Sequence, residues 1–251
     1  MPDHPVRPNH RGHDMTTTTL TASRLTAAAG VCAAVAGALY VGVQINHPPA
    51  DLDHITGANL LAREVAKMTM AAFAIIGFTG MLVRNRHKFG IFGAVSYVMV
   101  VIGYFAMFAN QVIVATVLPT LSKTDPDYVQ NYLDGALGNT PAGDIGAVQT
   151  LFLVTGMGYS IGGLLFGVAL YRAGILSRWA SALFAVGTVS ALTLAVLPQS
   201  FSRPAAVPVG IALMGLGYSL WRNRSDTITS VTAPAAGRAA SSVGSHEPAG
   251  R

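Results

Sequence analysis

The side chains that could bind a polar ligand lie where polar segments meet long uncharged stretches. Six of them are ligand-binding candidates: Gln44, Asn46, Lys67, Asn110, Gln111 and Gln149. Amide and ammonium groups at helix ends could orient a polar molecule if the helices enclose a shared cavity. Helix ends at a membrane interface are polar in every membrane protein, however, and the sequence alone leaves that alternative open.

The segment that follows the first apolar stretch carries side chains of the types that bind zinc. These are His47, Asp51, Asp53 and His54. Imidazole and carboxylate groups are zinc ligands, but aspartates are equally common as turn and cap residues next to a proline pair such as Pro48-Pro49. The four residues are therefore weak candidates, and no metal site is expected.

Signatures of common catalytic and cofactor sites do not occur in the sequence. The single cysteine, Cys32, excludes an intramolecular disulfide and a zinc site built on several thiolates. The sequence has no HExxH or GxSxG motif, and no pair of histidines within the apolar stretches that could ligate haem. We expect no catalytic residue and no cofactor.

The elements that must position the candidate residues are apolar helices. Only 11% of the 251 residues are charged and 51% are hydrophobic, whereas a soluble domain has roughly 25% charged residues. Several uncharged stretches reach the length of about 20 residues that a bilayer span needs. The composition predicts an all-α fold, a polytopic membrane bundle whose main partner is the lipid bilayer.

Six transmembrane helices are predicted within residues 25–222. They cover about 25–46, 57–84, 89–118, 145–171, 176–197 and 204–221. Thr56 is the expected N-cap of the second helix, and prolines are expected to end three of the others. Residues 1–24 are predicted to form a polar tail, with Met15 as a possible true start, and residues 223–251 a disordered tail.

The positions of lysine and arginine predict the orientation of the helices. Twelve of these residues fall on one side of the six spans and four on the other. Because cytoplasmic loops carry the excess of positive charge, both termini are predicted to be cytoplasmic. The basic residues are scattered without interleaved aromatic side chains, so no nucleic acid partner is expected.

The longest predicted connection, residues 121–145, contains a helix-start signal. Asp125 followed by Pro126 is typical of an N-cap with proline at the first helical position. Apolar residues then recur at helical spacing: Tyr128, Val129, Tyr132, Leu133 and Leu137. They predict a short amphipathic helix that lies either on the membrane surface or on the bundle as a solvated loop helix.

Small residues at four-residue spacing predict close packing between helices. The pairs are Gly158/Gly162, Gly163/Gly167, Ala33/Gly37 and Ala38/Gly42. This spacing places two small residues on one helix face, so that another backbone can approach. Packing within the chain is expected first, and a homo-oligomer or a membrane partner is the alternative.

One stretch of the chain resembles a known family. The glycine-rich run 162–167 is followed by Leu170-Tyr171-Arg172, Gly174, Leu176, Arg178-Trp179 and, after a proline-containing break, Leu220-Trp221-Arg222. Over residues 156–222 the chain is similar to a bacterial family of six-pass integral membrane proteins of unknown function. The resemblance implies the six-helix architecture and a place in the bacterial cytoplasmic (inner) membrane, and it transfers no catalytic residue. The glycine at position 174 is also expected, on physical grounds, to make the tight reversal between two helices.

The charge pattern also bears on function. No Asp, Glu, His or Arg is expected within the hydrocarbon, whereas proton relays and ion-coupled pathways usually contain such residues. We expect a non-enzymatic role in interaction, sensing or envelope maintenance. A small transporter or permease for an apolar or weakly polar solute is the alternative, and an enzyme that uses an outer Asp or His as general base is a third possibility.

Overall fold

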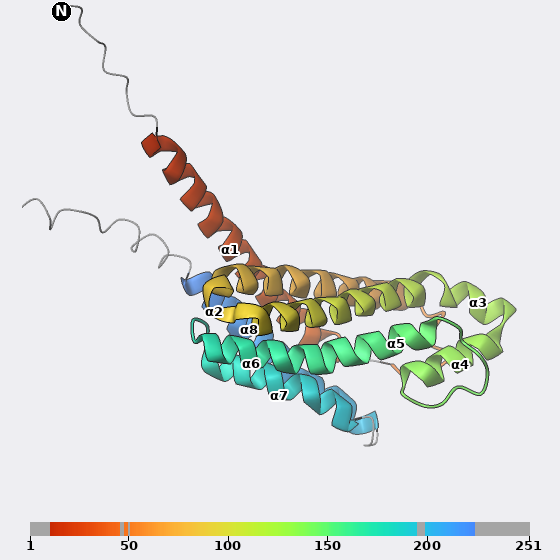
Figure 1. The fold of residues 1–251 in the computed structure, drawn as a ribbon. Helices are drawn as coiled ribbons and strands as arrows, with labels where there is room; N and C mark the ends of the chain where they lie inside the picture. Colours follow the sequence, from red (N-terminus) through yellow and green to blue (C-terminus); the bar gives the residue numbers. More distant parts are fainter. Residues whose placement is uncertain (1–10, 46–47, 50, 195–198, 224–251) are drawn as a thin grey trace, which may run out of the picture.

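A computed structural model describes the backbone of residues 11–45, 48–49, 51–194 and 199–223, and the side chains of most of them. Two of the sequence candidates, Asn46 and His47, lie outside the described residues, as do residues 1–10 and the predicted tail beyond residue 223. Every regular element in the described part is helical (Figure 1). The predicted all-α class is confirmed for this part of the chain.

The elements follow one another with short connections. They are α1 (Arg11–Gly42), α2 (Leu60–Thr116), α3 (Leu118–Thr124), α4 (Pro126–Ala136), α5 (Val148–Met157), the π-helix η1 (Gly158–Gly162), α6 (Gly163–Ala173), α7 (Arg178–Leu194) and α8 (Gln199–Arg222). α1 begins at Arg11, well before the predicted start at residue 25. The threonine-rich segment between these two positions contains no proline that would stop a helix. α8 likewise begins before the predicted start at residue 204.

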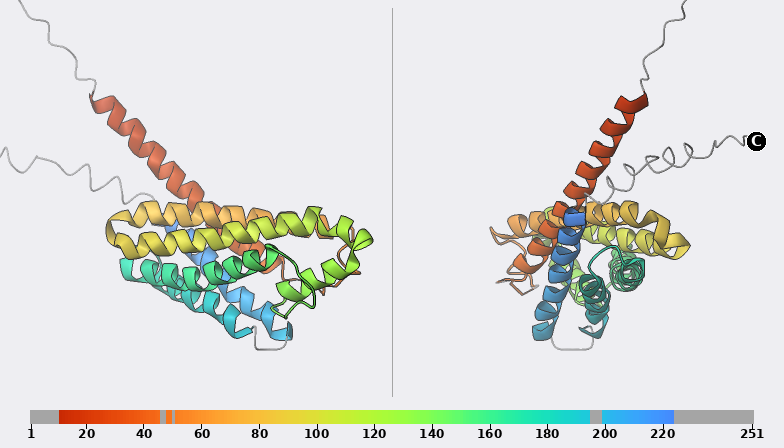
Figure 2. Two further views of the ribbon diagram at one scale, coloured as in Figure 1. Left: turned by 45° about the vertical axis from the view of Figure 1, so that its right-hand side comes forward. Right: turned by 90° about the vertical axis from the view of Figure 1, so that its left-hand side faces the viewer.

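α2 is a hairpin of two long helical halves. Gly90 has φ 55° and ψ −161°, a conformation that glycine adopts without steric cost, and the chain reverses there. The two halves lie side by side (Figure 2), and Phe78 of the first contacts Tyr104 of the second. They correspond to the predicted helices 57–84 and 89–118. The N-cap prediction is wrong, because α2 starts at Leu60, after Asn59 instead of Thr56.

α5, η1 and α6 together form one continuous rod in place of the predicted helix 145–171. Five residues, Gly158–Gly162, widen to a π-helix in its middle, and Tyr159 and Ser160 are buried there. Gly174 ends the rod in the left-handed conformation, with φ 66°. This confirms the expected tight reversal into α7.

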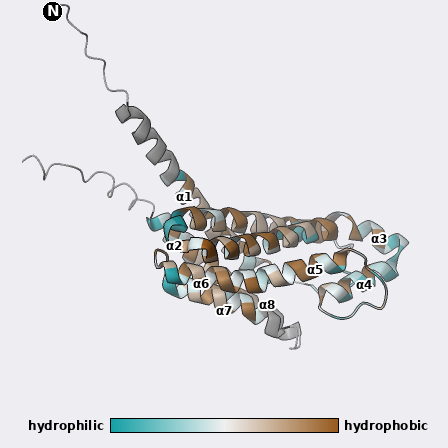
Figure 3. Cartoon of the chain, viewed as in Figure 1, coloured by the Kyte–Doolittle hydropathy of each residue, from teal (hydrophilic) through white to brown (hydrophobic). Residues whose placement is uncertain are grey.

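Three helical stretches of the described chain are long and apolar enough to cross a membrane. They are Ser23–Gly42, Leu60–Thr116 and Val148–Ala173. Hydrophobic residues occupy the middle of the bundle, and hydrophilic ones gather toward its two ends (Figure 3). An apolar belt between polar ends is the surface that a bilayer requires.

Aromatic rings fill the centre of the bundle. Phe78 lies 5.0 Å from Tyr104, 5.4 Å from Phe166 and 5.6 Å from Phe184, measured between ring centroids. All four side chains are fully buried. We call these four residues the aromatic core. Because T-shaped and tilted ring contacts pack densely, the aromatic core closes the bundle between its ends.

Glycines bring two pairs of helix backbones into contact. α1 crosses α8 with Gly30 against Gly217 and Gly37 against Gly210, so that a Cβ added at Gly217 would lie 2.5 Å from the Gly30 carbonyl oxygen. Similarly, a Cβ at Gly158 would lie 2.5 Å from the Cα of Gly103 in α2. We call these two contacts the glycine seams. Both lie within the chain, the arrangement expected from the small-residue spacing.

The predicted packing glycines differ in their surroundings. Gly162 lies against Val100, Gly163 against Thr188 and Gly167 against Ala185. Gly42, by contrast, has no heavy atom within 4 Å of the position that a Cβ would take. Gly42 is the last residue of α1, beyond the point where α1 crosses α8, and nothing in the described structure packs on it.

Candidate functional site

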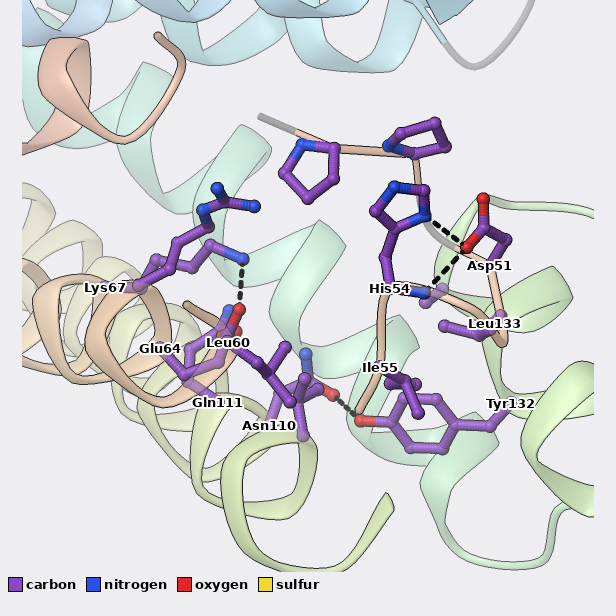
Figure 4. Close-up of a pocket in the computed structure, with 15 residues that line it drawn as sticks. Asp51, His54, Ile55, Leu60, Glu64, Lys67, Asn110, Gln111, Tyr132 and Leu133 are labelled. Carbon is purple, nitrogen blue, oxygen red and sulfur yellow. Dashed lines mark hydrogen bonds and ion pairs between the residues drawn. The ribbon is translucent and has the colours of Figure 1, made fainter. Parts of the chain in front are cut away.

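A mostly apolar pocket of about 180 Å³ lies at one end of the bundle (Figure 4). The connection between α1 and α2 covers it, the two ends of the α2 hairpin form its walls, and α4 closes one side. Its lining residues are Pro48, Pro49, Asp51, His54, Ile55, Leu60, Arg63, Glu64, Lys67, Asn110, Gln111, Val114, Tyr132, Leu133 and Ala136. Segments that are far apart in the sequence therefore meet at one site.

An ion pair on the first turns of α2 is the most buried polar feature of the pocket. Lys67 Nζ donates to Glu64 Oε1 at 2.7 Å, and both side chains are largely removed from solvent, with 18% and 2% of their areas exposed. The second carboxylate oxygen, Glu64 Oε2, is buried and has no hydrogen-bond partner in the described structure. A buried acceptor without a partner costs about 1–3 kcal/mol, and more when it is charged.

The second polar feature joins the α2 hairpin to α4. The Tyr132 hydroxyl donates to Asn110 Oδ1, and the Tyr132 ring packs at 5.1 Å from the ring of Phe152. Burial raises the pKa of the Tyr132 phenol well above its usual value, so the hydroxyl remains a donor at neutral pH. This contact holds α4 over the pocket.

The sequence dictates the position of α4 locally. Asp125 accepts a hydrogen bond from the Tyr128 backbone N–H at 3.0 Å, and Pro126 occupies the first turn, which confirms the predicted helix start. Val129, Tyr132 and Leu133 face inward and are buried. Of the two expected arrangements of this amphipathic helix, the structure has the one in which its apolar face packs on the bundle.

Asp51 and His54 form a pair at the outer edge of the pocket. Asp51 Oδ1 accepts hydrogen bonds from both the His54 backbone N–H, at 3.0 Å, and the His54 Nδ1. These bonds lower the pKa of the Asp51 carboxyl from its model-compound value of 3.8, with the imidazole as the largest cause. The pair fixes a turn in the connection between α1 and α2.

Several of the sequence candidates meet in this pocket and others do not. Lys67, Asn110 and Gln111 line it, as do the weak metal candidates Asp51 and His54. The remaining described candidates lie outside it: Gln44 is half-buried, and Asp53 and Gln149 are exposed. No group of three or more potential metal ligands occurs among the described residues.

Three polar residues that line the pocket are not among the ligand-binding candidates chosen from the sequence: Arg63, Glu64 and Tyr132. Glu64 lies three residues before Lys67, so a helix from residue 60 onward brings the two charges together. That spacing was a usable signal. The burial of Glu64 was not, because the residues that line the pocket with it come from α4 and from residues 48–49 and 51–55, elsewhere in the chain.

The opposite end of the bundle is basic and tied together by backbone contacts. Arg84 donates to the Asn223 carbonyl at 3.0 Å, and Lys88 lies 3.4 Å from the Ala173 carbonyl. Asn223 Nδ2 in turn donates to the Ile175 carbonyl at 3.0 Å. Arg172 lies over Phe92, and Arg222 lines a hollow together with Ile175, so basic residues from three separate connections lie at one end, away from the pocket.

Comparison with known proteins does not identify the function of this site. No protein-family model matches the chain, and no curated protein or solved structure is significantly similar to it. The resemblance over residues 156–222 therefore remains an expectation. The site has to be interpreted from its own geometry.

Proposed function

We propose that the chain is a six-span protein of the bacterial cytoplasmic membrane that binds a small ligand in the end pocket and acts as a non-enzymatic sensor. The proposal is supported by the apolar belt, by the three membrane-length stretches and by the separation of the basic end from the pocket. The positive-inside rule assigns the basic end and both termini to the cytoplasm, which makes the pocket face outward.

The observation that carries the proposal is the packed aromatic core that lies deeper in the bundle than the pocket. Tyr104 of the aromatic core lies six residues before Asn110 on α2, and so about 9 Å deeper in the bundle. A ligand that enters the pocket meets packed rings instead of a path to the other end. This arrangement favours binding over passage, and therefore sensing over the alternative of a small transporter.

The lining also offers the groups that bind a small molecule. Asn110 and Gln111 offer amide groups beside apolar walls, a combination that is typical of sites for small molecules.

Flux and binding measured on the same preparation test the proposal. We expect small amphiphiles to raise the Tm of the purified chain, Asn110→Ala to weaken this shift, and sealed proteoliposomes to take up none of the bound compound. The control, Gln149→Ala, alters an exposed amide outside the pocket and should leave the shift unchanged. Uptake that Asn110→Ala abolishes would instead establish the transporter.

Reporter fusions test the topology. A reporter joined after Arg222 should be active only in the cytoplasm, and one inserted after Gly138, in the turn that follows α4, only outside. The reverse pattern would overturn the orientation and place the pocket on the cytoplasmic side.

A further inference from the structure

The charges around the end pocket restrict the ligand that it can hold. Its lining carries two basic side chains, Arg63 and Lys67, and two carboxylates, Asp51 and Glu64. The formal charges of the lining therefore sum to zero when His54 is neutral. A ligand with a net charge would leave one charge uncompensated in a mostly apolar site, which is costly, whereas a neutral or zwitterionic ligand keeps the balance.

Glu64 determines the first group of that ligand. Its Oε2 is buried, has no hydrogen-bond partner among the described residues and belongs to a side chain that is 2% exposed on a wall of the pocket. Only a hydrogen-bond donor satisfies this oxygen. A protonated amine does so best, because hydrogen bonds between charged groups are roughly twice as strong as those between neutral groups.

Lys67 determines the second group. A lysine ammonium has three donors, and one of them is used in the 2.7 Å bond to Glu64 Oε1. Lys67 and Glu64 lie on the same wall of the pocket (Figure 4), so the other two donors of the ammonium suit an acidic group. Binding an amine at Glu64 and an acid at Lys67 extends the ion pair into an alternating row of four charges, in which every charge has an opposite neighbour.

The rest of the pocket determines the body of the ligand. Leu60, Val114 and Leu133 present apolar side chains, and the cavity measures about 180 Å³. An engineered protein cavity of about 150 Å³ holds one benzene molecule. The pocket therefore suits an apolar body of that size attached to a compact charged head.

We propose that the end pocket binds a zwitterion whose primary ammonium donates to Glu64 Oε2, whose acidic group lies against Lys67, and whose apolar body fills the remaining space. This inference rests on the proposed function and names its ligand class. Two sources offer the chemistry: a free α-amino acid with an apolar side chain, and the head group of an ethanolamine phospholipid.

The test uses the full chain in phosphatidylglycerol nanodiscs, which contain no amine. One arm adds leucine and, separately, 4-methylpentanoate, which lacks the amine, and isopentylamine, which lacks the acid. The other arm replaces part of the lipid with phosphatidylethanolamine. We expect Tm to rise with leucine or with phosphatidylethanolamine, and to change far less with either single-group analogue. The arm that responds identifies the source.

Variants connect the response to Glu64. Glu64→Gln keeps the shape of the side chain but presents only one acceptor oxygen and no charge, so the affinity for the responding zwitterion should fall at least tenfold. Asp53→Asn removes an exposed carboxylate outside the pocket and should change nothing. If Glu64→Gln fails to fold, Ala136→Leu at the exposed rim of the pocket should block the same response.

The outcomes separate this inference from the proposed function. The proposal that the pocket binds a zwitterion is overturned if Glu64→Gln leaves the affinity unchanged, or if the wild type responds to neither zwitterion. A different outcome is that zwitterions do not bind but a single-group analogue does, and that Ala136→Leu abolishes this binding. The pocket would then still be a ligand site, and only the proposed ligand class would be wrong. The sensing proposal then stands.

Discussion

The glycine seam at Gly103 and Gly158 and the end pocket share helix α2 but are packed in opposite ways. At the seam, Gly103 and Gly158 let two backbones touch, and no side chain fits between them. At the pocket, the two ends of the α2 hairpin are separated by a cavity of about 180 Å³ with charged walls. Small residues close the bundle in its middle, and large polar residues keep one end open.

This difference indicates where the chain can tolerate polarity. In the aromatic core, rings contact rings and the fit is determined by shape. The Tyr104 hydroxyl of the aromatic core and Glu64 Oε2 are both buried without a hydrogen-bond partner among the described residues, but only Glu64 Oε2 belongs to an ion pair on the wall of a cavity. A carboxylate oxygen without a partner on a cavity wall is a place where a ligand could complete the hydrogen bonding.

The largest expected effect comes from filling a glycine seam. Gly158→Leu places a side chain against the Gly103 backbone, which cannot move aside as a flexible side chain would. Overpacking costs about 1–3 kcal/mol in ordinary cores and more where backbone must shift, so we expect a loss of at least about 3 kcal/mol. Unfolding of the detergent-solubilised protein by a denaturing detergent measures it.

Gly42→Leu is the matched control for this experiment. The same substitution enters open space at the end of α1 and should change the free energy of unfolding by about 0.5 kcal/mol or less. Equal effects at Gly42 and Gly158 would show that the seam is not a close contact.

The second largest effect is expected at the end pocket, from removal of one partner of its ion pair. Lys67→Met keeps the volume of the side chain but leaves Glu64 buried without its cation. Loss of one partner from a buried pair costs about 3–5 kcal/mol, and the opening of the pocket to water should reduce this to about 2–3 kcal/mol. Unfolding in the same detergent series measures the cost.

A double substitution sharpens the comparison between the two regions. Glu64→Leu combined with Lys67→Met replaces the pair by apolar groups and should recover most of the stability lost in Lys67→Met alone. The double variant should also lose the response to zwitterions. Stability that is lost in the double variant as fully as in the single one would mean that the pair is structural.

Much of the fold could be predicted from local signals, and the pocket only in part. The Asp125 cap and the Gly174 reversal depend on a few adjacent residues, so the sequence reveals them directly. The pocket depends on how helices rotate about their own axes. Gln149 turns outward on α5, while Glu64 turns inward beneath α4, and no local pattern distinguishes these two directions.

The smallest expected effect lies at the edge of the pocket, where Asp51 and His54 are exposed. The folded chain holds the Asp51 carboxyl at a lower pKa than the unfolded chain, so their hydrogen bonds add stability above the unfolded value near 3.8, and this contribution disappears as the pH falls through the folded pKa. Asp51→Asn should therefore lower Tm slightly at pH 7, and the two proteins should converge at acidic pH. A Tm difference that grows on acidification would contradict the pairing.

Because Asp51→Asn also shifts the charge balance of the pocket by one, the affinity for the zwitterion should fall modestly, far less than in Glu64→Gln. The deep carboxylate would then be the one that binds the ligand, and the rim carboxylate the one that shapes the turn.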